Sequence, residues 1–233
     1  MKRHAFVVAT LVLAVFAARV GTAGATSECR GFMACVPVPG PWVVVPTSSA
    51  VQRPQVQFTL TCPKGFIVGG VDAELSNRAI DVWFFGAIGS PVAPGRTTSR
   101  SVVFVATYVG SGAPAVTFRP HAGCIPGSGG GSRTPTAFHP VFPVGKPTVR
   151  RVENARVVAV PALRTYTVRC RRDEQLVAAY TARGFRMKRP PSAQLIRSLT
   201  ARSHVTRSGI SVEAGGGNGQ GVVQVAAVCA GGK

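Results

Sequence analysis

Two short segments of the sequence alternate apolar and polar residues and then end on a cysteine. The first is VQFTLTC, residues 56–62, and the second is RTYTVRC, residues 164–170. Strict alternation of this length is typical of a β-strand with one buried face. After each segment come a short polar turn, an apolar run and finally another strand that ends in a cysteine, Cys124 or Cys229. The sequence therefore predicts an internal repeat of β-rich units.

The cysteine spacing extends this repeat. There are 61 residues between Cys62 and Cys124, and 58 between Cys170 and Cys229. An even number of cysteines in an exported chain favours disulfides. We expect each of these two pairs to be bonded, with a stabilisation of about 4 kcal/mol on the chain-entropy model. Cys29 and Cys35 are then left to pair with each other.

The expected fold class is all-β, with two similar disulfide-tied β-sandwich domains in tandem. Residues 51–125 form the first domain and residues 161–233 the second. Before them lies an N-terminal Cys loop with a Pro-rich segment at 26–50, and between them a Gly/Ser/Pro-rich linker at 126–160. Residues 36–49 are expected to form a loop. The segment AQLIRSLTARS, 193–203, fits a strand and a short helix equally well.

Residues 1–25 have the pattern of a signal peptide. Lys2 and Arg3 are a basic start, an apolar run of 14 residues follows, and Ala23-Gly24-Ala25 is a small-x-small cleavage pattern. The apolar run is short for a membrane span. We expect a secreted or envelope-associated chain with no transmembrane segment after cleavage. A retained N-terminal anchor is the alternative.

The tetrapeptide Ile67-Val68-Gly69-Gly70 matches the start of activated trypsin-like serine proteases. Activation requires a basic residue before the isoleucine, but Phe66 stands there, and the family's Thr-Ala-Ala-His-Cys and Gly-Asp-Ser-Gly-Gly segments are absent. Without them the base and acid that a nucleophile needs are not indicated. We interpret 67–70 as part of a strand whose glycines mark a bulge or a close backbone approach.

Other catalytic and metal signatures are absent from the sequence as well. It contains no Cys-x-x-Cys, no His-Glu-x-x-His and no phosphate-binding loop, so neither a metal nor a cofactor is predicted. Asp72, Glu74 and Asp81 lie close together in the sequence. A pair of carboxylates can act as acid and base in glycoside hydrolysis. A secreted hydrolase that acts on glycans with the carboxylates of this segment is therefore the alternative function.

The positive charge is concentrated in the second half. Residues 146–233 carry 16 basic and four acidic groups, whereas residues 26–145 carry eight and four. A basic surface binds polyanions such as acidic glycans or anionic cell-wall polymers, and the alternative is that the charge only reflects composition and solubility. Aromatic residues are scarce near the basic positions, which argues against nucleic acid. The candidate polyanion-binding residues are Arg183, Arg186, Lys188, Arg189, Arg197, Arg202 and Arg207.

The first repeat opens with Cys62-Pro63, Gly65 and the pair Gly69-Gly70. The second closes with AVCA at 227–230. It departs from the first in having Arg171-Arg172 after its cysteine and Ala178-Ala179 in place of the glycines. The chain thereby resembles secreted proteins of high-GC Gram-positive bacteria that carry tandem modules of the form Cys-Pro-x-Gly, Gly-Gly and Val-Cys-Ala. The resemblance implies the fold and secretion but no activity.

From these observations we expect an exported, non-enzymatic binding or structural module of the cell envelope or extracellular space. Its basic second domain would bind polyanions. The sequence does not indicate an oligomeric state.

Overall fold

A computed structural model of the chain describes residues 26–48, 53–85, 100–127, 149–152, 158–159 and 163–231. These residues are nearly all β, as predicted, and within them one short helix, α2, is found. The predicted signal peptide and most of the predicted linker lie outside the described residues. No described helix has the length and apolar character needed to cross a bilayer.

The strands of the first half are β1 (Val36–Pro39), β2 (Trp42–Val45), β3 (Gln55–Thr61), β4 (Phe66–Leu75), β5 (Ile80–Phe85), β6 (Ser101–Tyr108) and β7 (Val116–Pro126). The elements of the second half are β8 (Val149–Val152), β9 (Val158–Ala159), β10 (Arg164–Arg169), β11 (Glu174–Phe185), α2 (Ala193–Ser198), β12 (Thr200–Thr206), β13 (Gly209–Gly215) and β14 (Gly221–Gly231).

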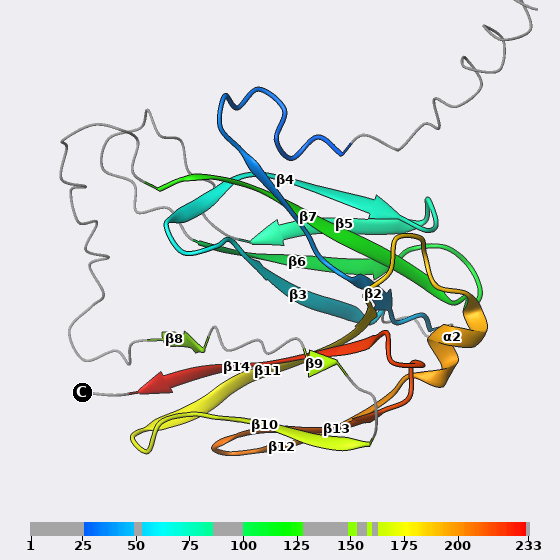
Figure 1. The fold of residues 1–233 in the computed structure, drawn as a ribbon. Coiled ribbons are helices and arrows are strands. Elements are labelled where there is room, and N and C mark those ends of the chain that lie inside the picture. The colour runs from blue at the N-terminus through cyan, green and yellow to red at the C-terminus, as the bar shows by residue number, and fades with distance from the viewer. Residues whose placement is uncertain are drawn as a thin grey trace, which may run out of the picture.

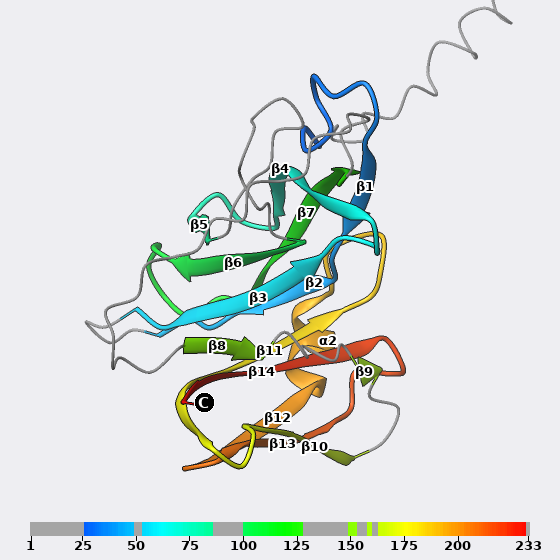
Figure 2. The same ribbon diagram turned by 90° about the vertical axis from the view of Figure 1, so that its left-hand side faces the viewer.

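The two halves have the same strand pairing. In the first half, β3, β6 and β5 form a three-stranded sheet and β4 pairs with β7; in the second, β10, β13 and β12 form such a sheet and β11 pairs with β14. All these pairs are antiparallel. The halves lie one above the other in Figure 1, and Figure 2 shows the same stacking from the side.

Strand β2 joins the halves into one sheet, because it pairs with β7 on one edge and with β11 on the other. Val43 and Val45 of β2 lie in the core of the first half, and Val44 lies in the core of the second. The expectation of a loop at 36–49 is therefore wrong: β1 and β2 both lie in it. Because the segment is rich in proline, the sequence did not indicate β2, whose side chains are buried on both faces. That the halves are separate tandem domains stays a prediction.

Three disulfides join Cys29 to Cys35, Cys62 to Cys124 and Cys170 to Cys229, as the repeat predicted. Each of the two long-range bonds connects the residue after β3 or β10 with a buried cysteine in the last strand of the same half, β7 or β14. Cys124 and Cys229 are fully buried in the two cores. The disulfides therefore tie the ends of each half together from inside.

A β-bulge interrupts both long strand pairs at the same distance from the cysteine. In β4 the register shifts between Val68 and Gly70, and in β11 it shifts between Leu176 and Ala178. The expected bulge at the glycines is thus confirmed. The matching residues in the second half are Val177 and Ala178, so the sequence alignment with Ala178-Ala179 was wrong by one residue. With this correction, the bulge lies the same number of residues after Cys62 as after Cys170.

The segment with two open interpretations contains both kinds of structure. Helix α2 spans Ala193–Ser198, and the Ser192 side chain caps its N-terminus by accepting a hydrogen bond from the Leu195 N–H at 3.3 Å. Leu199 is buried and ends the helix, and β12 begins at Thr200. The predicted linker contains the last residue of β7 and the strands β8 and β9, which pair with β14.

Candidate functional sites

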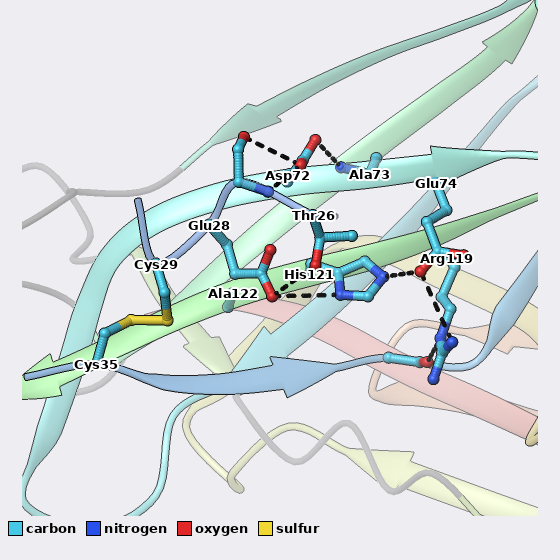
Figure 3. Close-up of polar contacts among 12 residues, drawn as sticks. Thr26, Glu28, Cys29, Cys35, Asp72, Ala73, Glu74, Arg119, His121 and Ala122 are labelled. Carbon is cyan, nitrogen blue, oxygen red and sulfur yellow. Dashed lines mark hydrogen bonds and ion pairs between the residues drawn. A yellow bond between two sulfur atoms is a disulfide. The ribbon is translucent and has the colours of Figure 1, made fainter. Parts of the chain in front are cut away.

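One group of polar side chains lies on the outer face of the large sheet, beneath the N-terminal segment. We call it the carboxylate–imidazole cluster, and Figure 3 shows its contacts. Strands β4 and β7 position four of its members, because the register places Asp72 opposite His121 and Glu74 opposite Arg119. Its members are Glu28, Asp72, Glu74, Arg119 and His121.

The N-terminal segment reaches this cluster because two glycines leave room for its backbone. Gly70 and Gly123 face each other in the β4–β7 pair. A Cβ on either glycine would collide with the carbonyl oxygen of Glu28. The close approach predicted for the Gly69-Gly70 pair is therefore present, and its partner is the loop that the Cys29–Cys35 disulfide closes.

His121 lies between two carboxylates. Its Nε2 is 2.8 Å from Oε1 of Glu74, and its Nδ1 is 3.6 Å from Oε1 of Glu28. His121 and Glu28 are only 5% and 4% exposed. Thr26 donates its hydroxyl hydrogen to Glu28 at 3.1 Å, and Arg119 lies 3.7 Å from Glu74 and donates to the Gly40 carbonyl. These contacts fasten the N-terminal segment to the sheet.

Asp72 holds the same segment from its other side. Its Oδ2 accepts hydrogen bonds from the backbone N–H of Ser27 at 2.6 Å and from the Ser27 hydroxyl at 3.1 Å, and its Oδ1 accepts one from the Ala73 N–H. Burial raises the pKa of Asp72, but these hydrogen bonds, followed by the charge of His121, outweigh it and hold the pKa below the ordinary 3.8.

The acid and base groups of the cluster contact each other or the N-terminal segment. Glu28 and His121 are buried, and the carboxylates of Asp72 and Glu74 are occupied by hydrogen bonds and ion pairs. Asp81, the third carboxylate of the hydrolase alternative, is exposed on β5 in a different sheet and makes none of these contacts. The three carboxylates are therefore not brought together into one site.

The cluster also does not suit a metal ion. Glu28 and Glu74 lie at different nitrogens of the His121 ring, so one ion could not be bound by the imidazole and both carboxylates. Elsewhere in the described residues, Cys170, Glu174 and Cys229 have the spacing of metal ligands. Their two sulfur atoms are bonded to each other, which removes the thiolates that a metal requires.

The predicted basic residues do not form one patch. Arg183 is half-buried, its Nη1 donates to the Leu199 carbonyl at 2.9 Å, and burial lowers its pKa. Arg202 is exposed on β12, and Arg207 is exposed in the turn after it. The others are exposed around α2, at the far end of β11 from Arg207: Arg186, Lys188, Arg189 and Arg197.

Arg207 instead lies beside three arginines that the sequence did not single out. The Leu176 N–H donates to the Arg207 carbonyl at 3.0 Å, and the Cys170 N–H donates to the Ser208 carbonyl at 2.8 Å. These bonds join the turn after β12 to Cys170, which follows β10, and to the start of β11. The arginines at the end of β10 and in the turn after it are all exposed: Arg169, Arg171 and Arg172. The signal in the sequence was the Arg-Arg pair that replaces Pro-Lys after the cysteine.

Beside these turns, the outer face of the β10–β13–β12 sheet has a hollow of about 490 Å³. The register places Gly209 between Arg169 and Thr206, so this cross-strand row has no side chain at its centre. The next row consists of Thr167, Ser211 and His204. The hollow is lined by Arg169, by five residues that carry hydroxyl groups, and by Gly209 and Ile210, so none of its described lining residues is aromatic.

Three ion pairs are found among the described side chains of Glu28, Glu74, Arg119 and His121, and all three belong to the carboxylate–imidazole cluster. No arginine or lysine of residues 163–231 pairs with a carboxylate of the described residues. Comparison of the chain with protein-family models, with curated proteins and with solved structures finds no match.

Proposed function

We propose that the protein is an exported, non-enzymatic binding or structural module of the cell envelope or extracellular space, and that its second half binds anionic polymers. Export is supported by the signal-peptide pattern of residues 1–25 and by three disulfides, which persist in oxidising compartments.

The observation that carries this proposal is the set of exposed basic side chains in residues 163–231, none of which pairs with a carboxylate of the described residues. Residues 163–231 hold eleven arginines and lysines against Asp173, Glu174 and Glu213. Ten of the eleven are exposed, and only Arg183 is directed into the structure. Guanidinium groups that face solvent can pair with anionic groups of a polymer and release its counterions. An anionic polymer is the partner that this charge distribution favours.

Two observations support this choice over the other classes. Phe185, the aromatic residue within the basic stretch 183–189, is fully buried, so it cannot stack on a base. The carboxylates of the hydrolase alternative are either engaged in the cluster, as Asp72 and Glu74 are, or separate from it, as Asp81 is. Neither nucleic-acid stacking nor acid–base catalysis therefore has a complete site in the described residues.

The test is binding of labelled heparin, a sulfated glycan, by the disulfide-bonded protein. Two triple variants remove three charges each from the second half: Arg186/Lys188/Arg189→Ala and Arg169/Arg171/Arg172→Ala. The matched control is Arg30/Arg53/Lys64→Ala, which removes three exposed charges from the first half. We expect at least one second-half variant to lose about tenfold or more in affinity and the control to lose much less. Equal losses in all three would contradict the proposal.

The hydrolase alternative is tested with the same preparation. Purified cell wall and soluble glycans are incubated with the protein, and released reducing ends are measured. We expect no bond cleavage. Cleavage that is lost in an Asp72/Glu74→Ala variant that still folds would overturn the non-enzymatic proposal.

A further inference from the structure

The hollow on the β10–β13–β12 sheet has donors on one side and acceptors on the other. On the β10 side lie Arg169, Thr165 and Thr167, and these side chains make no hydrogen bond within the described residues. Across the hollow, the Thr206 hydroxyl donates to the Gly209 carbonyl at 3.2 Å, and the Ser211 hydroxyl donates to the His204 carbonyl at 3.5 Å. The Thr206 hydroxyl also lies 3.5 Å from the Ser208 hydroxyl. With their hydrogens directed at these carbonyls, the Thr206 and Ser211 oxygens can each accept a further hydrogen bond.

The charges around the hollow are also ordered along the strands. Arg169 lies at the end next to the turns, where Arg171, Arg172 and Arg207 are exposed. Asp173 is an exposed acid of the same turn. Two rows away, Glu213 is opposite Thr165 on one side and Arg202 on the other. The positive end is therefore the end at Arg169, and the acid at Glu213 disfavours an anion at the opposite end.

The shape of the hollow depends on Gly209. This glycine faces outward between Arg169 and Thr206, and a Cβ there would collide with the Val168 carbonyl oxygen. The pairing of β13 with β10 therefore excludes any residue larger than glycine at position 209, and no side chain covers the floor of the hollow there. A volume of about 490 Å³ is larger than a single oxyanion needs.

We propose that this hollow is a subsite for one anionic ester, a phosphate or a sulfate, carried on a hydroxyl-rich unit such as a sugar. The inference rests on the proposed polyanion binding and names the chemical group that is recognised. Arg169 and Thr167 donate to the ester oxygens, and Thr206 and Ser211 accept from the hydroxyl groups of the same unit. A purely anionic polymer without hydroxyl groups could accept from Arg169 and Thr167 but could not donate to Thr206 and Ser211.

The test is titration of the disulfide-bonded, full-length protein with labelled heparin oligosaccharide of fixed length. Arg169→Gln is compared with Arg186→Gln, an equal charge change at the other end of β11. Thr167→Val removes the donor, and Thr167→Ser restores it. We expect about tenfold weaker binding for Arg169→Gln, about fivefold for Thr167→Val, a clearly smaller loss for Arg186→Gln than for Arg169→Gln, and binding near wild type for Thr167→Ser. Near-UV circular dichroism identifies variants that fail to fold. If Thr167→Val fails to fold, Ser211→Ala is used in its place and is also expected to weaken heparin binding.

The outcomes separate the two proposals. If the wild type binds no heparin, polyanion binding itself is wrong and this inference falls with it. If the wild type binds but Arg169→Gln weakens binding no more than Arg186→Gln, or Thr167→Val behaves like Thr167→Ser, the subsite alone is wrong. Polyphosphate and single-stranded DNA of equal charge are the comparison ligands. Equally tight binding of polyphosphate, or base-dependent binding of DNA, would overturn the assignment of a hydroxyl-rich unit.

Discussion

The side-chain amide of Gln224 pairs with both backbone groups of Thr59. Its Oε1 accepts from the Thr59 N–H at 2.6 Å, and its Nε2 donates to the Thr59 carbonyl at 2.8 Å. Gln224 lies on β14 of the second half, Thr59 lies on β3 of the first, and the glutamine is 3% exposed. A single side chain thus takes the place of a neighbouring strand on the free edge of β3 and joins the two halves.

Replacement of Gln224 by leucine is expected to destabilise the protein by about 2 kcal/mol or more, because both Thr59 groups lose their partner at a buried position. Gln224→Glu retains the acceptor, loses the donor and buries a charge, so it is expected to be at least as harmful. Urea denaturation gives the free energy of unfolding. The control is Gln175→Leu at an exposed position on β11. A Gln224→Leu variant as stable as this control would show that the amide does not join the halves.

Asp72 makes stability depend on pH in the acid range. Its folded pKa lies below 3.8, so the carboxylate stabilises the fold at pH values above the unfolded pKa, and this contribution is lost as the pH falls through the folded value. At pH 6 we expect Asp72→Asn to cost about 1 kcal/mol, which allows for the partial exposure of the group. The difference from wild type shrinks below about pH 4. With the exposed Asp81→Asn as control, a difference that is constant from pH 6 to pH 2.5 would contradict this account.

Gly70→Ala is expected to displace the N-terminal segment without unfolding the cores, since the added Cβ meets the Glu28 carbonyl. Hydrogen exchange should become faster in residues 26–35. Exchange in α2 is the internal control and should not change. If the amides of 26–35 exchange as slowly as in the wild type, the glycine is not needed for this contact.

The disulfides are expected to contribute unequally. On the chain-entropy model, replacing both cysteines of the Cys170–Cys229 pair, separated by 59 residues, costs about 4 kcal/mol. Replacing the Cys29–Cys35 pair, separated by six residues, costs about 2 kcal/mol. Equilibrium denaturation of the two double Cys→Ala variants measures the difference. A larger loss from the short loop would contradict the model and show that the N-terminal segment stabilises more than its closure entropy suggests.

Local patterns in the sequence were sufficient to predict the strands that end at or next to the four repeat cysteines, and the two long-range disulfides. Val56, Phe58 and Leu60 alternate into a buried face, and the equal spacing from Cys62 and Cys170 identified the repeat. The bulge at Gly69 followed from glycine chemistry in a strand. The strands within residues 36–49 could not be predicted in this way. The prolines of this segment are typical of loops, and its valines are buried only because both halves cover β2.

Neither candidate site could be read from sequence neighbours. His121 meets Glu28 and Glu74 only through the β4–β7 register and the Cys29–Cys35 loop. The basic residues chosen from the stretch 183–189 are separated by the length of β11 from the turn at Arg207, whose neighbours are Arg169, Arg171 and Arg172. Spatial neighbours on different strands depend on pairing register, which short motifs do not specify.

The most direct measurement of the central claim is the salt dependence of heparin binding by the intact protein. Binding constants are determined at several salt concentrations and plotted on logarithmic axes. If the exposed arginines of residues 163–231 neutralise four or more anionic groups, we expect the logarithm of the binding constant to fall with the logarithm of the salt concentration with a slope of about −3 or steeper. The slope for Arg169/Arg171/Arg172→Ala is expected to be shallower. Binding that is absent at low salt, or that does not change with salt, would contradict it.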